Sequence, residues 1–512
     1  MDYRFVLRQL GVLLVVLGGS MVLSLAWAIG DYRQGNADEW PAIVAFSISI
    51  GVCLALGVGA YLKGRGSRSG LRRREALLLV GVSWLSIAAL AGLPFYLWAK
   101  LQGHLDHVSP FSMYVNCYFE AMSGLTTTGA SVLTNIEACP PAILFWRAFT
   151  HWLGGLGIIV LFVAVFPALG VGGKRLFRIE SPGPVPEGVR PKIGEAARVL
   201  WLIYLMLTVA EATLLRLLGM TWFEALCHTF ATLATGGFST RNASVGHYDS
   251  VAIEGVIIVF MILAGVNFGL YYRMAGGRWS AVFQDRELRV YLLIIVVATC
   301  LIVASIAPSV VTTTREDHVG PSLGTAVRYG LFHAVSLQTT TGFCTAEFDH
   351  WPFVAKCTLL ILMFIGASGG STGGGIKVVR IMMAAKIMWA ELEKVFRPNV
   401  VRTIRVGKAA IDPDLKLATM VYLCLVLFLF AAGTILIMVC QTGTDIDIAT
   451  AATASAATLN NIGPGLAEVS ATANYGWFSP QAKIVMSLLM VLGRLEVYAV
   501  FVLFMPRFWR SE

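Results

Sequence analysis

Long apolar stretches alternate with short polar segments along the whole 512-residue chain. Because a helix needs about 20 apolar residues to cross a bilayer, this pattern predicts membrane-spanning helices. The ten predicted spans lie near residues 10–29, 41–62, 76–98, 142–166, 197–218, 251–272, 288–307, 353–365 with a continuation, 417–440 and 482–504. The first stretch has the look of a signal peptide, but it exceeds the usual core of about 7–15 apolar residues and a second span follows at once. We therefore expect a retained helix.

Four shorter apolar segments, each about a dozen residues long, lie between pairs of the later spans. They cover residues 110–123, 222–234, 325–339 and 446–460. At 1.5 Å per residue, such a helix cannot cross a hydrocarbon layer of about 30 Å. Irregular backbone at membrane depth is stable only where it lines water or is packed inside protein. We therefore predict half-crossing pore helices, each followed by a re-entrant strand.

Each short segment ends in small or polar residues around one glycine. The four endings are 126–129 (Thr-Thr-Thr-Gly), 234–237 (Ala-Thr-Gly-Gly), 339–342 (Thr-Thr-Thr-Gly) and 460–463 (Asn-Asn-Ile-Gly), with glycines 108, 105 and 121 residues apart. Such residues let backbone carbonyls turn inward and replace the water that an ion loses. The carboxyl ends of the pore helices would favour a cation. The alternative, four ordinary polar loops, does not explain why the pattern recurs in register.

The pattern predicts an all-α polytopic membrane protein with potassium-channel-like architecture. Two extra N-terminal transmembrane helices occupy residues 1–70. Four tandem helix–pore loop–helix repeats then surround a central pore, with expected bounds 71–175, 176–285, 286–410 and 411–512. Four such units in one chain can enclose a pore without oligomerisation.

Composition and charge placement agree with a membrane protein. Charged residues make up 13% of the chain and hydrophobic residues 57%, whereas a soluble domain is about 25% charged. The net charge of +9 does not indicate nucleic acid, because 29 of the 39 Lys and Arg fall in alternate loops. By the positive-inside rule, those loops and both termini are expected in the cytoplasm. The nine cysteines show no paired metal-ligand spacing, although a Cys117–Cys139 disulfide is conceivable.

At these repeated segments the sequence resembles the Trk/Ktr/HKT superfamily of potassium transporters, most closely its bacterial TrkH/TrkG branch. The resemblance covers essentially the whole chain and implies channel-like potassium uptake across the bacterial cytoplasmic (inner) membrane. It implies a selectivity filter formed by Thr127, Thr128, Gly129, Thr235, Gly236, Gly237, Thr340, Thr341, Gly342, Asn461, Ile462 and Gly463. In each strand, the backbone carbonyls of the two residues before the last glycine would hold potassium. These residues are Thr127, Thr128, Thr235, Gly236, Thr340, Thr341, Asn461 and Ile462.

The resemblance also bears on selectivity and partners. Sodium-preferring members replace the first-repeat glycine by serine, so Gly129 favours potassium, while the threonine-free fourth strand leaves the sharpness of selectivity open. Potassium is the expected ion, with no organic cofactor. Expected partners are a second copy of the chain, a TrkA-like ring of nucleotide-binding regulatory subunits and membrane lipid.

A glycine-rich stretch, residues 366–377, interrupts the second helix of repeat three. Its six glycines in ten residues would each cost a helix interior about 1 kcal/mol, so it should not be helical. A phosphate-binding loop does not fit, because Ile376 separates Gly375 from Lys377. The resemblance implies an intramembrane gate; a plain kink or a cytoplasmic linker is the alternative. The predicted gate residues are Gly366, Gly369, Gly370, Gly373, Gly374, Gly375, Lys377 and Arg494.

Arg494 lies within the apolar span expected at 484–504. A buried arginine costs roughly 2.5–3.5 kcal/mol on insertion scales, so it should face water or an acceptor. The resemblance places its counterpart in the pore near the gate. We expect Arg494 to contact the gate carbonyls and to oppose cations; pairing with an acid of another repeat is the alternative. We expect Glu120, Glu211 and Glu224 to brace the filters rather than bind ions.

The remaining alternatives concern the basic loops and other classes of function. The stretch 377–416 would contact anionic headgroups or, together with the loop 174–198, dock the regulatory subunit. A secondary cation transporter with broken helices, sodium-preferring or coupled to protons or sodium, is the second hypothesis. An enzyme is not expected, because His151, His228 and His333 are scattered and lack zinc-ligand spacing.

Overall fold

The computed structural model describes residues 1–36, 39–66, 73–102, 110–164, 193–399, 405–406, 409–410, 413–441, 445–495 and 497–510. Residues 174–192 of the proposed docking loop lie outside the described residues, as does part of the basic stretch 377–416.

Two long helices precede the repeats. α1 (Tyr3–Arg33) and α2 (Trp40–Lys63) pack against each other in opposite directions. A Cβ on Gly11 would lie closer than 3.0 Å to backbone atoms of Gly57 and Tyr61. Small residues therefore allow the two backbones to approach closely, as is usual for helices in a membrane.

The first two repeats follow in chain order. Repeat one contains α3 (Arg73–Ala91), α4 (Leu93–Leu101), η2 (Pro110–Ser112), α5 (Tyr114–Leu125) and α6 (Pro141–Ala164). Repeat two contains α8 (Ile193–Leu217), α9 (Trp222–Leu233), η4 (Ser244–Tyr248), α10 (Val251–Ala264), α11 (Phe268–Ala275) and α12 (Ser280–Phe283).

The last two repeats follow, and repeat three carries two short strand pairs as well as helices. Repeat three contains α13 (Arg286–Ile306), β1 (Val311–Thr312), β2 (His318–Val319), α14 (Leu323–Gln338), η5 (Phe348–His350), α15 (Phe353–Phe364), α16 (Val378–Phe396), β3 (Arg405–Val406) and β4 (Ala409–Ala410). Both strand pairs are antiparallel. Repeat four contains α17 (Pro413–Cys440), α18 (Ile448–Leu459), η6 (Ala467–Val469), α19 (Pro480–Arg494), α20 (Tyr498–Phe501), η7 (Val502–Phe504) and α21 (Pro506–Trp509).

The four short helices α5, α9, α14 and α18 coincide with the predicted pore helices. Local capping explains where two of them begin. Thr221 and Glu224 form a reciprocal capping box at the start of α9, and the Ser322 hydroxyl accepts the Thr325 N–H at the start of α14. These caps satisfy backbone N–H groups that have no partner within the helix.

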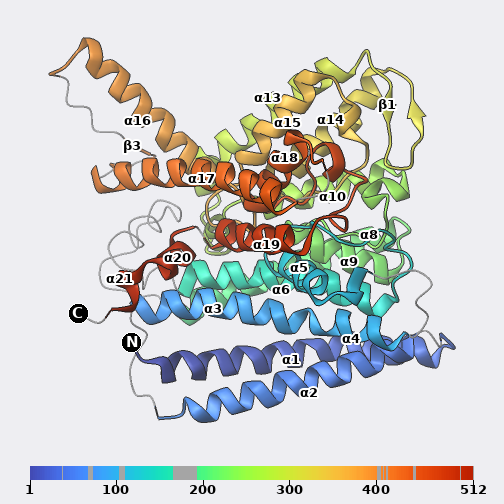
Figure 1. Cartoon of the computed structure of the whole chain (residues 1–512). Helices are drawn as coiled ribbons and strands as arrows, with labels where there is room; N and C mark the ends of the chain where they lie inside the picture. Colours follow the sequence, from blue (N-terminus) through green and yellow to red (C-terminus); the bar gives the residue numbers. More distant parts are fainter. Residues whose placement is uncertain are drawn as a thin grey trace.

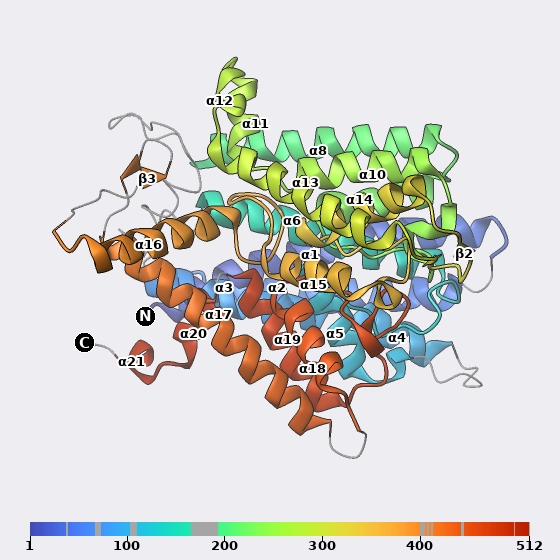
Figure 2. The ribbon, with the colours of Figure 1, turned by 90° about the horizontal axis from the view of Figure 1, so that it is seen from above.

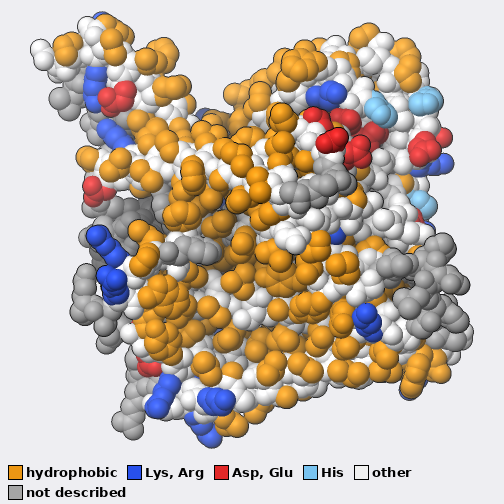
Figure 3. Space-filling view, viewed as in Figure 1, with side chains coloured by type: hydrophobic (Ala, Val, Ile, Leu, Met, Phe, Trp, Pro, Cys, Tyr) orange, Lys and Arg blue, Asp and Glu red, His pale blue; other side chains and the backbone are white. Residues whose placement is uncertain are grey.

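Six described helices are long and apolar enough to cross a membrane, and the bent pair α10–α11 makes a seventh candidate. α6, the interrupted pair α15–α16 and α19 occupy the positions of the other three predicted spans. Figure 1 shows the long helices running side by side, with the start of α1 and α21 at the same end of the molecule as α16. Figure 3 shows a face that is mostly hydrophobic through its middle, as a lipid-facing surface requires.

Two predicted spans are not continuous helices. The stretch expected at 251–272 bends by 88° between α10 and α11. There the Asn267 side chain caps α11 by accepting the Gly269 N–H at 2.7 Å, and Gly265 carbonyl accepts the Ser368 N–H. The stretch expected at 482–504 ends its first helix at Arg494, because the Val497 N–H, with Val497 at φ 52°, closes onto the Leu492 carbonyl.

Candidate functional site

The four short helices all end with the same turn. The second residue after each helix is left-handed, namely Thr127 (φ 52°), Thr235 (56°), Thr340 (60°) and Asn461 (55°). The N–H of the residue after the left-handed one donates to the carbonyl of the residue five positions before it, with N···O distances of 2.7–2.9 Å in all four copies. This is a Schellman closure, in which glycine is the usual left-handed residue. Holding threonine there costs about 1–3 kcal/mol, so the surrounding structure must impose the conformation.

The residues after these turns meet in a closed ring. A Cβ built on each filter glycine would lie closer than 3.0 Å to the carbonyl oxygen of the next repeat, in the pairs Gly129–Gly236, Gly237–Thr341, Gly342–Ile462 and Gly463–Thr128. The pairs run from repeat one through repeat four and back to repeat one. We call residues 128–129, 236–237, 341–342 and 462–463 the filter ring. The structure thus brings the four predicted strands together around one axis.

A cavity lies next to the filter ring, on the side where the chain continues after the four filter glycines. It measures about 180 Å³ and is lined by residues that follow the ring in every repeat, among them Ser131, Ser239, Cys344 and Pro464. We call this cavity the vestibule.

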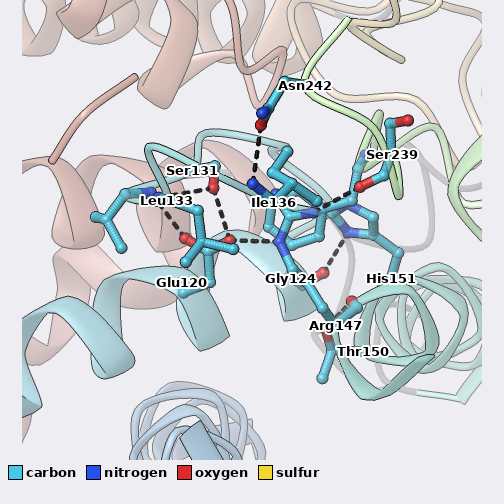
Figure 4. Close-up of polar contacts among 12 residues, drawn as sticks. Glu120, Gly124, Ser131, Leu133, Ile136, Arg147, Thr150, His151, Ser239 and Asn242 are labelled. Carbon is cyan, nitrogen blue, oxygen red and sulfur yellow. Dashed lines mark hydrogen bonds and ion pairs between the residues drawn. The ribbon is translucent and has the colours of Figure 1, made fainter. Parts of the chain in front are cut away.

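The second repeat departs from the others at Gly236, where the equivalent residues are Thr128, Thr341 and Ile462. The imidazole of His151, from α6, occupies the space that a side chain at 236 would need, with ring atoms 2.5–2.6 Å from a built Cβ. His151 Nδ1 donates to the Gly124 carbonyl at 2.8 Å, and its Nε2 accepts the Phe238 N–H at 3.2 Å (Figure 4). The sequence analysis did not assign this role to His151; the missing side chain at 236 was the available signal.

The glycine loop, residues 365–377, lies against the helix ends of three repeats. Its base is closed by a bridge between Ile365 and Ile376. The Gly374 N–H donates to Thr340 Oγ1 at 2.6 Å, and Thr235 Oγ1 donates to the Thr372 carbonyl at 2.9 Å. A Cβ on Gly374 would lie closer than 3.0 Å to the Asn460 carbonyl oxygen. The loop therefore lies on the opposite side of the filter ring from the vestibule.

Side chains from neighbouring elements anchor the glycine loop. Glu287, at the start of α13, accepts the Gly369 N–H at 2.7 Å and the Val379 N–H at 3.2 Å. Thr372 Oγ1 donates to the Leu233 carbonyl at 2.9 Å. Lys377 Nζ donates back to the Gly373 carbonyl. The predicted gate glycines thus occupy one hydrogen-bonded loop.

The structure brings Arg494 and the glycine loop together. Arg494 Nη1 donates to the Thr372 carbonyl at 2.7 Å, while its side chain is only 3% exposed. Its Nε and Nη2 have no hydrogen-bond partner within the described residues. A cavity of about 10 Å³, room for roughly one water, is lined here by Gly373, Gly374 and Arg494. This cavity is therefore far smaller than the vestibule.

Two of the expected bracing acids hold the segments that follow the filters. Glu120 Oε1 accepts from Arg147 Nε at 2.5 Å and from Ser131 Oγ at 2.9 Å (Figure 4). Glu224 pairs with Arg241 at 2.7 Å. Glu211 is fully buried in α8 and belongs to neither network. Cys117 and Cys139 are free thiols, so the conceivable disulfide is absent.

Comparison with known proteins shows the family of the chain. The model of the TrkH family of cation transport proteins matches residues 44–511. The chain belongs to this family. The Trk system potassium uptake protein TrkH of Escherichia coli K12 is 37% identical over 526 residues, covering 100% of both chains. TrkG of the same organism is 30% identical over 473 residues, covering 92% of both.

A solved structure matches over the same extent. The crystal structure of the potassium transporter TrkH from Vibrio parahaemolyticus has a TM-score of 0.86 at 34% identity, covering 100% of both chains. The family resemblance and the all-α polytopic membrane fold expected from the sequence are therefore confirmed. Membership places the chain among cation transport proteins.

Proposed function

We propose that the chain takes up potassium by channel-like permeation through the filter ring. The observation that carries this proposal is the closed circuit of four glycines and four carbonyls, one from each repeat. Its relatives are named as potassium uptake proteins, which supports potassium as the ion. Carbonyls and threonine hydroxyls of the filter residues would replace the water of a partly dehydrated ion.

The driving force requires no chemical step. Four helix carboxyl ends approach the ring, and their partial negative charges favour a cation there. Moving one charge across a potential of 100 mV yields about 2.3 kcal/mol, which concentrates a cation on the negative side.

The glycine loop is the proposed gate, and the described conformation is the closed one. The cavity lined by Gly373 and Arg494 measures about 10 Å³, too little for a hydrated ion. The Arg494 guanidinium adds a positive charge with two unsatisfied nitrogens at this point. Opening would displace the loop and release the Arg494–Thr372 contact.

The proposed orientation places the glycine loop, α16 and both termini toward the cytoplasm. Positive-inside placement of the basic loops supports this orientation. α16 projects from the body (Figures 1 and 2), and its exposed apolar residues are Met388, Trp389, Leu392, Val395 and Phe396. Such a surface suits a second copy of the chain. The basic stretch 377–416 is the proposed dock for a nucleotide-binding regulatory subunit or for anionic lipid.

A secondary cation transporter is the second candidate. The observations that favour it are the 88° bend between α10 and α11 and the interruption between α15 and α16, since transporters often bind ions at broken helices. Coupling of potassium uptake to a proton or sodium gradient distinguishes the two candidate functions. A transporter would show uptake that depends on a proton or sodium gradient, whereas a channel-like pathway follows the potassium gradient and the membrane potential.

Radioactive rubidium uptake into liposomes containing the purified protein tests the proposal, with sodium as competitor and protein-free liposomes as control. Wild type should take up rubidium in preference to sodium. Gly129→Ser should weaken that preference, because its Cβ would meet the Gly236 carbonyl oxygen and Gly129 has φ +83°. Absence of flux with and without the regulatory subunit would overturn the proposal.

A further inference from the structure

Four side chains at matching positions in the short helices accept hydrogen bonds from the segments that follow the filter ring. They are Glu120, His228, His333 and Thr453. The first three stand nine residues before their filter glycine, whereas Thr453 stands ten before, next to Ala454. We call these four side chains the acceptor ring.

The contacts of the acceptor ring are similar in all four repeats: three acceptors face a backbone N–H, and His228 faces the Ser239 hydroxyl. Each donor lies two or three residues after the filter glycine. The four contacts are Val132 N–H to Glu120 Oε2 at 2.9 Å, Ser239 Oγ to His228 Nε2 at 3.0 Å, Thr345 N–H to His333 Nε2 at 3.5 Å, and Leu466 N–H to Thr453 Oγ1 at 3.1 Å. One geometrical task is therefore performed by three different residue types.

In the neutral imidazole, hydrogen-bond partners set which nitrogen of His228 and of His333 accepts. His228 Nδ1 lies 2.8 Å from the Glu224 carbonyl, and His333 Nδ1 lies 2.9 Å from the Tyr329 carbonyl. A carbonyl only accepts, so Nδ1 carries the hydrogen in both rings and Nε2 is left as an acceptor. Ser239 Oγ accepts the Arg241 N–H at 3.0 Å and still has one hydrogen that it can donate to His228 Nε2.

A metal site does not fit these side chains. All four are buried, with at most 4% exposure, so each needs a partner inside the protein. Among the described residues, no three His, Cys, Asp or Glu side chains are grouped as a metal ion would require. Their polar atoms contact instead the segments that follow the filter ring.

We propose that the acceptor ring positions the filter carbonyls and thereby sets ion selectivity. Each filter strand is held at its start by the Schellman turn and, only a few residues later, by the acceptor ring. Without the hydrogen bond to the acceptor ring, the filter glycine and the carbonyl of the residue before it would be free to shift. Selectivity among cations depends on where such carbonyls lie and how freely they move. This inference rests on the proposed function.

Paired substitutions test the acceptor ring by the ratio of rubidium to sodium uptake. Thr453→Val keeps the shape but removes the acceptor, whereas Thr453→Ser retains it. Likewise His228→Leu removes an acceptor that His228→Gln can replace. Removing an acceptor should lower the uptake ratio roughly fivefold, the factor that corresponds to one net hydrogen bond. The conservative variants should stay within about twofold of wild type, as should His350→Leu, which alters an exposed histidine outside the ring.

A second measurement does not depend on conduction. Hydrogen exchange of the Leu466 amide should accelerate in Thr453→Val and stay slow in Thr453→Ser. Folded Thr453→Val with an unchanged uptake ratio would overturn the proposal, even if His228→Leu failed to fold. If wild type itself conducted nothing, the proposed function would fail, while amide exchange would still decide whether the acceptor ring holds the strand.

Discussion

The imidazole of His151 lies against Gly236 and takes the place of its side chain. It also joins two repeats, because its two nitrogens bind Gly124 in repeat one and Phe238 in repeat two. The glycine in the second filter strand is thus matched to a histidine 85 residues earlier in the chain.

This match predicts coupled effects at the two positions. Gly236→Ala should reduce rubidium uptake roughly tenfold or more, because forcing a methyl group into a packed site costs about 1–3 kcal/mol. Combining it with His151→Ala should restore part of the uptake by opening space. Uptake by Gly236→Ala equal to that of wild type would show that the contact between His151 and Gly236 does not affect ion uptake.

Arg494→Ala should raise uptake in the absence of any regulatory subunit. The substitution removes both the hydrogen bond to Thr372 and the buried charge beside the glycine loop. Arg494→Lys retains the charge and serves as the matched control, with uptake near that of wild type. Proteoliposome flux measures both, and identical flux from wild type and Arg494→Ala would refute the gate role.

Glu287→Gln should loosen the glycine loop without disrupting the fold. Glu287 accepts two backbone N–H groups with one carboxylate oxygen, and hydrogen bonds to a charged acceptor are stronger than neutral ones by about 1 kcal/mol. Hydrogen exchange at Gly369 and Val379 should become roughly fivefold faster. Unchanged protection at both amides would mean that Glu287 does not hold the loop.

Arg147→Met should lower thermal stability strongly in detergent. It leaves Glu120 buried without its ion-pair partner, which typically costs 3–5 kcal/mol. The double variant Arg147→Met with Glu120→Gln removes the stranded charge and should recover part of the unfolding midpoint. If the single variant unfolded at the wild-type temperature, the pair would not stabilise the repeat.

Local sequence patterns were sufficient to predict the elements that build the filter. Apolar length, followed by a glycine-containing polar stretch, located α5, α9, α14 and α18, because both signals arise within a few residues of each other. The same logic identified the glycine loop, since six glycines cannot form a stable helix.

Contacts between distant segments could not be predicted in this way. The break at Gly265 depends on hydrogen bonds with the glycine loop about 100 residues away, and the end of α19 at Arg494 depends on a turn within an apolar run. His228 and His333 looked like isolated histidines until folding placed them at equivalent positions. The two hairpins in repeat three are too short for any periodic signal.

In the proposed pathway, the filter ring binds the permeating ion. Anomalous X-ray scattering from crystals grown in rubidium tests it most directly, because rubidium replaces potassium and marks its own position. We expect a rubidium peak on the axis enclosed by the carbonyls of Thr128, Gly236, Thr341 and Ile462. Rubidium peaks elsewhere in the protein, with none in this ring at saturating concentration, would contradict it.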